Sequence, residues 1–189
     1  MTRFFSSDWH FSHPKVAELR GFDTIELHDE WLMDTIAEKM RSKKDIMFFL
    51  GDLALSVTGI NKGLDFIKTL PGSFRMIAGN HDRCAGLLKG SSKWVARYME
   101  AFDSVNDIGT ASINGEDFIL YHYPFLRPDT EVKYAEYRLT PQGKRLLCGH
   151  THCTSFYTDR DDEFQIGIDT GKIYAEGELC RLTKAGKIC

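Results

Sequence analysis

The sequence predicts a mixed α/β protein in which two β-sheets pack together. Short apolar runs of strand length alternate with longer amphipathic stretches in the first half of the chain, whereas strands dominate the second half. No internal repeat, low-complexity tract or Pro/Gly/Ser-rich linker interrupts the 189 residues. We therefore expect residues 1–189 to form a single domain, which is long enough to bury a full hydrophobic core.

Six apolar runs have the length and the flanking turn residues that are typical of β-strands. These predicted strands cover residues 3–7, 45–50, 74–78, 118–121, 145–148 and 164–168. Asn114 and Gly115 stand between the short apolar segment 111–113 and the fourth run. Because Asn-Gly favours a two-residue hairpin turn, we expect an antiparallel pair of strands around it.

Three amphipathic stretches predict helices. Apolar residues recur at near-helical spacing over residues 27–40 and again over 60–70, where Pro71-Gly72 is expected to stop the helix. Aromatic and aliphatic residues mark a third helix over 94–102. The segment 123–144 carries aromatic and basic residues without a clear period, and long loops of this kind often form lids or substrate walls.

Composition and charge exclude several classes of protein. The hydrophobic content of 42% and the charged content of 27% are ordinary for a folded domain and exclude intrinsic disorder. No apolar run approaches the roughly 18 residues of a membrane span, and Asp8 lies where a signal peptide would still be apolar. A net charge of −3 does not suit nonspecific nucleic-acid binding. We expect a cytoplasmic protein with reduced cysteines, no membrane association and no stable nucleic-acid complex.

Five of the predicted strands end in polar residues that could bind a metal or move a proton. These residues are Asp8 and His10, Asp52, Asn80 with His81 and Asp82, His122, and His150 with His152. Loops converge at the carboxyl ends of strands in α/β sheets, so the five ends are expected to meet. Of the seven histidines, only His28 lies away from these blocks, at a helix start that we expect to be solvated.

The residue types at these strand ends favour a metal centre. Carboxylates, an amide oxygen and imidazoles form a mixed oxygen and nitrogen set that suits Mn, Fe, Zn, Co or Ni better than Ca or Mg alone. The set exceeds the needs of one tetrahedral zinc ion but suffices for two ions that share a carboxylate. An alternative is a structural zinc site at Cys148 and Cys153, which bracket two of the histidines, but no second Cys pair of the usual spacing is present.

The five polar blocks resemble those of the calcineurin-like metallophosphoesterase family, in particular its small stand-alone bacterial and phage members. The blocks are Asp8-x-His10, Gly51-Asp52, Gly79-Asn80-His81-Asp82, His122 and Gly149-His150-Thr151-His152, in the order of the family. The resemblance spans residues 8–152. It implies a four-layered αββα sandwich of two mixed β-sheets flanked by helices.

The resemblance also implies a role for each residue. It assigns Asp8, His10 and His152 to a first metal, Asn80, His122 and His150 to a second, and Asp52 to both as a bridge. A metal-bridging hydroxide would attack phosphorus while His81 protonates the leaving oxygen and Asp82 orients His81. The cofactors would be two divalent transition-metal ions, with Mn as the first choice and Fe, Zn, Co or Ni as alternatives.

Three residues near these blocks are candidate substrate contacts. His13 resembles the second His of the Asp-x-His-Phe-Gly-His opening of small members, although Ser12 replaces that glycine. Arg83 follows the Gly-Asn-His-Asp block, and Arg127 lies in the irregular segment after His122. The alternatives are a surface histidine at a helix start for His13 and solvated charges for both arginines.

Three other residues are expected to play a background role. Lys133 and Arg138 share the irregular segment with Arg127, and scattered loop charge is the favoured interpretation of them as well. Asp169 follows the last predicted strand and is expected to be structural.

The predicted function is a dinuclear metal-dependent phosphoesterase that hydrolyses phosphodiester or phosphomonoester bonds of small nucleotide-like substrates. No Gly-x-Ser-x-Gly elbow, Walker-type loop or Gly-x-Gly-x-x-Gly fingerprint supports another chemistry. The alternative is a noncatalytic scaffold of the same fold that binds proteins. Scaffold members tend to lose the catalytic histidine or metal ligands, whereas this chain keeps all of them. The acidic pI and the lack of an aromatic and basic groove disfavour a nuclease.

Overall fold

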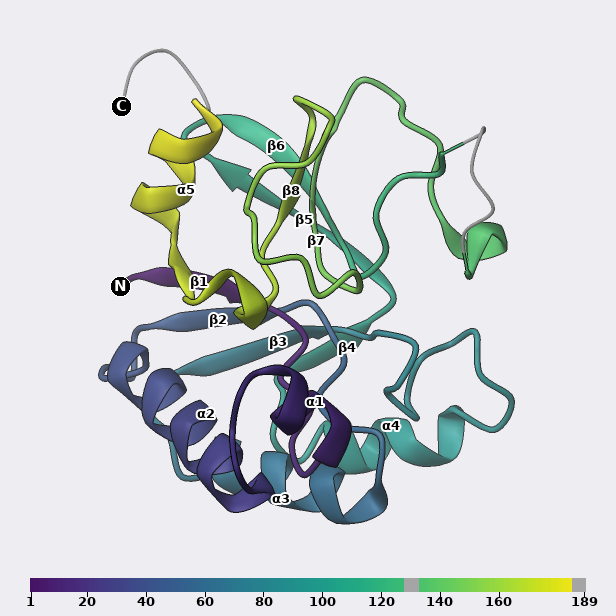
Figure 1. The fold of residues 1–189 in the computed structure, drawn as a ribbon. Coiled ribbons are helices and arrows are strands. Elements are labelled where there is room, and N and C mark those ends of the chain that lie inside the picture. Colours follow the sequence, from purple (N-terminus) through teal and green to yellow (C-terminus); the bar gives the residue numbers. More distant parts are fainter. Residues whose placement is uncertain (128–132, 185–189) are drawn as a thin grey trace.

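The computed structural model describes residues 1–127 and 133–184, which form two mixed β-sheets and five α-helices (Figure 1). The sheets lie one above the other, with α1 to α4 below the first sheet and α5 beside the second. The helices are α1 (Pro14–Leu19), α2 (Ile25–Lys39), α3 (Val57–Ile67), α4 (Ser92–Tyr98) and α5 (Glu176–Thr183). The prediction of an α/β sandwich with two mixed sheets is confirmed.

The first sheet has the strand order β4-β3-β2-β1-β9. Its strands are β1 (Arg3–Ser6), β2 (Ile46–Phe49), β3 (Ser73–Ile77), β4 (Ser104–Asn106) and β9 (Tyr174–Ala175). β1 to β4 are mutually parallel, and β9 pairs antiparallel with β1. Parallel neighbours need long crossover connections, and these connections contain α1 and α2, then α3, then α4. All four helices therefore cover the same face.

The second sheet has the strand order β5-β6-β7-β8. Its strands are β5 (Ile108–Ile113), β6 (Glu116–Tyr121), β7 (Arg145–Cys148) and β8 (Glu163–Gln165). β5 and β6 form the expected hairpin, in which Asn114 and Gly115 have φ values of 49° and 81°. Positive φ at both central residues is the conformation that a type I′ turn requires. β6, β7 and β8 run parallel to one another.

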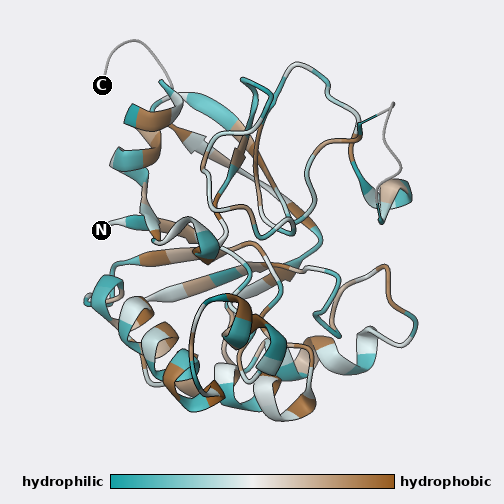
Figure 2. Cartoon of the chain, viewed as in Figure 1, coloured by the Kyte–Doolittle hydropathy of each residue, from teal (hydrophilic) through white to brown (hydrophobic). Residues whose placement is uncertain are grey.

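Strand alternation divides the apolar residues between two principal cores. Met47 and Phe49 of β2 face the helices, whereas Phe48 faces the second sheet, where it packs with Phe118 and Leu147. Figure 2 shows brown along β2 in the interior, whereas the helices below the first sheet alternate between brown and teal. On the far side of the second sheet, a smaller cluster packs Phe125, Leu139 and residues of β6 and β7 together. The loop segment after β6 therefore covers this face.

Two sequence-based expectations about location need comment here. No helix in the described parts of the chain is long and apolar enough to cross a bilayer. Cys84, Cys148 and Cys153 are free thiols, as expected. Cys180, however, is disulfide-bonded, so the expectation that all five cysteines are reduced is wrong.

Candidate metal centre

The topology brings the five predicted blocks to one edge of the sandwich. β3, β2 and β1 are adjacent and parallel in the first sheet, and β6 and β7 are adjacent and parallel in the second. Their carboxyl ends therefore point the same way within each sheet. A bridge between Ser7 and Gly167 joins the end of β1 to the segment after β8. The expectation that the strand-end residues meet is confirmed by the side-chain distances below.

Left-handed backbone conformations recur at the candidate ligands. The residues Asp8, His10, Asp52, His150 and His152 have φ values of 60°, 55°, 62°, 73° and 52°. Such conformations cost on the order of 1 kcal/mol or more for a non-glycine residue and persist only where the surroundings impose them. Here the two loops clamp each other, since the backbone N–H of Asp8 donates to Gly51 O at 2.8 Å and that of His10 to Asp52 O at 3.0 Å.

Two glycines allow the loops to approach the ligands closely. A Cβ on Gly149 would clash with the Asp8 carboxylate and the Ser7 hydroxyl, and a Cβ on Gly79 would clash with the Asp52 carboxylate. Glycine has no Cβ, so the backbone at these two positions can pack directly against the carboxylates.

A first cluster contains Asp8, His10 and His152, whose ligand atoms lie within 4.8 Å of one another. His10 Nε2 is 3.1 Å from His152 Nε2 and 3.7 Å from Asp52 Oδ2. His152 donates its Nδ1–H to Asp169 Oδ2 at 3.0 Å, which leaves its Nε2 lone pair directed at His10. Asp8 and His10 are buried, whereas His152 lies at the open edge.

A second cluster lies beside the first and shares Asp52 with it. Asn80 Oδ1 is 3.1 Å from His122 Nε2 and 2.8 Å from His150 Nδ1. Asp52 Oδ2 is 3.4 Å from the same His122 nitrogen. His122 donates its Nδ1–H to Leu50 O at 2.8 Å, and a carbonyl can only accept, so Nε2 is the ring nitrogen that faces the cluster and could bind a metal.

These atoms fit two divalent cations. Ligands bonded to one cation at about 2.1 Å and at right angles to each other lie about 3 Å apart, which matches the spacings in both clusters. His122 Nε2 faces the Asn80 and Asp52 oxygens, and a positive charge on this nitrogen, either a proton or a metal ion, stabilises that arrangement. Nitrogen and oxygen donors in this mixture suit a transition metal.

The pKa values of the clustered residues reflect their burial and the charges around them. Burial raises the pKa of Asp8 and lowers that of His150 to about 3. Burial also lowers the pKa of His122, but the charge of Asp52 outweighs it and raises the value to about 9. Burial raises the pKa of Asp52, and the surrounding histidines reverse this and lower it. Interacting acids and imidazoles of this kind concentrate at functional sites.

Comparison with known proteins places this arrangement in a family. Residues 1–176 match the calcineurin-like phosphoesterase superfamily domain. The chain belongs to this superfamily. Gene 66 protein of Mycobacterium phage L5 is 30% identical over 189 residues, which cover 93% of this chain and 91% of the phage protein. Uncharacterized protein MJ1445 of Methanocaldococcus jannaschii is 35% identical over 79 residues, 41% of this chain and 44% of its own length.

The fold of the phosphoesterase domain also recurs among solved structures. The crystal structure of AQ665 from Aquifex aeolicus, a protein of unknown function, superposes with a TM-score of 0.67 and 22% identity. The match covers 96% of this chain and 98% of that chain. At this level of identity the likeness concerns the fold alone.

His81 and Asp82 lie beside the two clusters, and no described contact joins their side chains. The Asp82 carboxylate accepts backbone hydrogen bonds from Asp52, Leu53 and Gly79 at 2.7–2.9 Å. Asp82 therefore ties the two ligand loops together, and the prediction that it orients His81 is wrong. His81 Nε2 lies 3.9 Å from Asp52 Oδ2, with its side chain 32% exposed at the rim.

A buried polar network behind the first cluster was missed by the sequence analysis. Arg20 donates to both oxygens of Asp169 at 2.8 and 2.9 Å and to the backbone carbonyls of Asp8 and Trp9 at 2.6 and 3.1 Å. It also contacts His28 Nε2 at 2.9 Å. The expectation that His28 is solvated is therefore wrong, and Asp169 is structural as expected.

The network continues from His28 to the opening loop of the site. His28 Nδ1 lies 3.1 Å from Asp29 Oδ1. The Asp29 carboxylate then accepts hydrogen bonds from the backbone N–H of Ser12 at 2.9 Å and from Lys62 Nζ at 2.7 Å. The network therefore holds the backbone of the opening loop at Asp8, Trp9 and Ser12. No local pattern in the sequence indicates these contacts.

The three candidate substrate contacts differ in position. His13 caps α1 by accepting a hydrogen bond from Val16 N at 3.3 Å, and its ring lies 5.6 Å from the ring of His10. Arg83 is exposed and lies 4.8 Å from the Trp94 ring centre. Arg127 forms ion pairs with Glu163 and Asp159 at 2.9 and 2.7 Å. Glu163 opens β8, at the opposite end from His150, so these pairs do not support a substrate contact for Arg127.

The alternative zinc site at Cys148 and Cys153 is not formed in the described structure. Cys148 is buried in the second sheet, where its Sγ lies 3.4 Å from Gln165 Nε2, whereas Cys153 is exposed. Burial raises the pKa of the Cys148 thiol well above its usual value, and a thiol held neutral is a poor zinc ligand.

Proposed function

We propose that this protein is a dinuclear metal-dependent phosphoesterase that hydrolyses phosphodiester bonds of small nucleotide-like substrates. The observation that carries the proposal is a pair of adjoining clusters of potential ligands, Asp8 with His10 and His152, and Asp8 with Asp52 and His122. His81 lies at their rim, near Asp52. Membership of the phosphoesterase superfamily agrees with this chemistry. Two divalent transition-metal ions, with Mn as the first choice, are the proposed cofactors.

The two sets of side chains divide between the ions. Asp8, His10 and His152 would hold the first ion, Asn80, His122 and His150 the second, and Asp52 both, because a carboxylate has two oxygens. When bound, the ions supply positive charge that polarises the phosphoryl group and lowers the pKa of water. The chain itself fixes the direction of each lone pair through Asp169 and Leu50 O.

His81 completes the reaction from the rim of the site. As water attacks phosphorus, the bond from phosphorus to the leaving oxygen breaks, and that oxygen needs a proton. His81 is the half-exposed imidazole that the two clusters leave free, and its Nε2 lies near their shared carboxylate. We assign it as the proton donor. Asp82 acts indirectly, since it joins the loops that carry Asp52 and Gly79.

A first experiment pairs metal analysis with turnover of bis-p-nitrophenyl phosphate. We expect about two transition-metal ions per chain and Mn-dependent hydrolysis that a chelator abolishes. His81→Ala is expected to keep both ions and lose about 100-fold or more in turnover, because general acid catalysis contributes that much. Unchanged turnover in this variant would contradict the assigned role of His81. Metal binding without turnover of any diester or monoester would support the alternative, a noncatalytic scaffold.

A further inference from the structure

A group of tyrosines borders the second ligand cluster. Tyr123 follows His122 directly, and its ring centre lies 5.1 Å from that of His122 and 4.9 Å from that of His150. Its side chain is only 1% exposed. Its hydroxyl has no hydrogen-bond partner in the described parts of the chain, although a buried hydroxyl ordinarily finds one.

Tyr134 and Tyr137 lie later in the chain, and their rings lie beside that of Tyr123. The Tyr134 ring lies 5.8 Å from Tyr123 and 5.5 Å from His150, and the Tyr137 ring lies 6.1 Å from Tyr123. Tyr137 belongs to a short 3₁₀ helix, Ala135–Tyr137, and Tyr134 precedes it with a φ of 61°. We call Tyr123, Tyr134 and Tyr137 the tyrosine wall.

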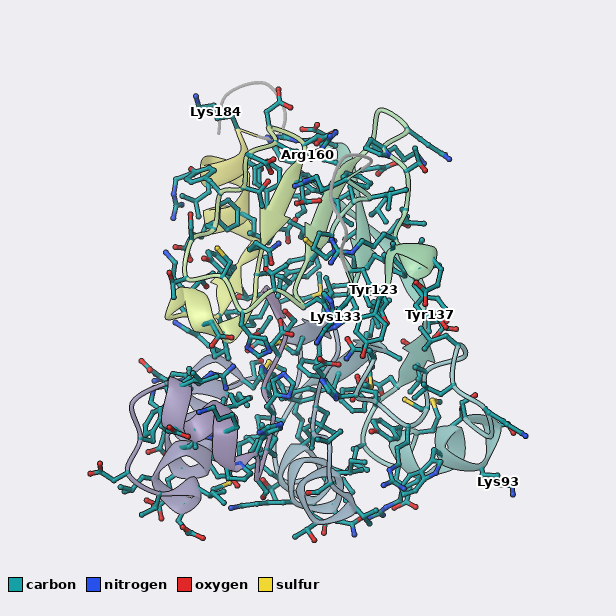
Figure 3. The ribbon with its side chains drawn as sticks, turned by 45° about the vertical axis from the view of Figure 1, so that its right-hand side comes forward. Lys93, Tyr123, Lys133, Tyr137, Arg160 and Lys184 are labelled. Carbon is teal, nitrogen blue, oxygen red and sulfur yellow. The ribbon has the colours of Figure 1, made fainter. Side chains whose placement is uncertain are left out.

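The tyrosine wall is open on one side and flanked by positive charge. Tyr134 is 36% exposed. Lys133 precedes it and is exposed, and Figure 3 shows Lys133 and Tyr123 where the two halves of the molecule meet, away from the peripheral Lys93 and Lys184. Arg138 follows Tyr137, and its buried Nε lacks a partner in the described residues. Aromatic faces beside cations suit a ligand that is both planar and anionic.

We infer that the tyrosine wall binds the nucleobase of a nucleoside phosphoester whose phosphate lies at the metal centre. This inference rests on the proposed phosphoesterase function and adds the chemical class of the group beyond the scissile bond. The exposed Tyr134 ring offers a stacking face, and Lys133 and Arg138, which precede and follow Tyr134–Tyr137 in the sequence, supply positive charge for a phosphate. The net charge of −3 argues against long nucleic acid and for a small nucleotide.

The test measures binding first, so that it does not depend on turnover. Calorimetry compares the affinity of the Mn-loaded protein for thymidine monophosphate and for methyl phosphate, which share the phosphate and differ in the base and sugar. We expect thymidine monophosphate to bind at least about fivefold more tightly, the low end of base–aromatic stacking. Tyr134→Ala should bring this ratio close to one, whereas Tyr134→Phe, which retains the ring, should preserve it.

Tyr157→Ala is the matched control, because Tyr157 is a 54% exposed tyrosine whose hydroxyl contacts Leu182 O near α5. It should leave the affinity ratio unchanged. A ratio near one in the unmodified protein, or a ratio that Tyr134→Ala does not alter, overturns the inference.

Measurements of turnover distinguish failure of this inference from failure of the proposed function. The p-nitrophenyl diesters of thymidine monophosphate and methyl phosphate have the same leaving group. Hydrolysis of both at equal kcat/KM would support the phosphoesterase function and contradict nucleobase binding by the tyrosine wall. Preferential nucleotide binding without hydrolysis of either would support the wall and contradict the proposed function.

Discussion

The two sides of the metal centre are built in different ways. Behind the first cluster, Arg20 makes contacts with Asp169, His28 and two backbone carbonyls, and every polar group of the network has a described partner. Beside the second cluster, the Tyr123 hydroxyl and Arg138 Nε are buried without one, and in the first cluster His10 Nδ1 lacks one as well. A satisfied network fixes geometry. The second side also exposes an aromatic ring, that of Tyr134, to which a ligand could bind. The first side therefore holds the ligands in place, and the second is the side where substrate recognition is expected.

The largest expected effect comes from removing the carboxylate that belongs to both sides. Asp52→Ala should lose both metal ions and reduce phosphodiester turnover to background, because Asp52 lies within 3.4–3.7 Å of a ligand nitrogen in each cluster. Elemental analysis of the purified variant checks this. A variant that still holds two ions per chain would show that the two sides bind metal independently.

Arginine substitutions compare the two sides in stability. Arg20→Met leaves the Asp169 carboxylate, 10% exposed, with His152 as its remaining partner, and should lower the free energy of unfolding by about 3 kcal/mol. Arg138→Met on the second side should cost about 1 kcal/mol or less, because Arg138 is half-buried and incompletely paired. Urea denaturation of the metal-free proteins measures both. Equal losses in the free energy of unfolding would contradict the proposal that the first side is fixed and the second is open.

Asp169→Asn should affect the two metal ions unequally. The carboxylate accepts from His152 Nδ1, a first-cluster residue, and makes no described contact with the second cluster. We expect the affinity for one ion to fall about 10- to 100-fold while the other is retained, as is usual for residues that orient a metal ligand. Manganese titration followed by calorimetry resolves the two sites. An equal fall at both sites would indicate that the network supports the whole centre.

The smallest expected effect is a pH dependence of stability on the first side. Burial raises the pKa of Asp29, but hydrogen bonds from His28, Lys62 and Ser12 outweigh it and lower the value to about 2. A lowered pKa stabilises the fold above the unfolded value of about 4, and this contribution is lost as pH falls towards 2. We expect at most about 2 kcal/mol from Asp29. Asp29→Asn should reduce the pH dependence of the free energy of unfolding, measured with urea, between pH 4 and pH 2. An unchanged pH dependence would exclude Asp29 as its source.

The sequence was sufficient for the sandwich and for the blocks at the strand ends because both leave local signals. Strands such as β2 and β7 are apolar runs that stop at glycine and a polar residue, and Asn114-Gly115 specifies its own turn. The shorter elements contain too few residues to show a recognisable apolar period. β9 has two residues, β4 three, and α1 six, and none of them was predicted.

Contacts between distant residues explain most of what was missed. Arg20 and Asp169 are 149 positions apart, so no local pattern joins them. Asp82 was assigned to His81 because the two are adjacent in sequence, but its carboxylate turns towards the backbone of a different strand end. The tyrosines at 123, 134 and 137 show no period, and their rings meet only because the chain folds back on itself.

The left-handed backbone at five candidate ligands has a consequence for laboratory evolution. At Asp8, His10, Asp52, His150 and His152 the φ values of 52–73° would be relaxed by glycine, which has no Cβ to strain. A library selected only for resistance to heat should therefore accumulate glycine at these positions and discard the metal centre. A library selected for turnover should keep all five and gain its stability elsewhere. The most strained part of the backbone would thus mark, without any assay of substrate, the residues that selection for activity protects.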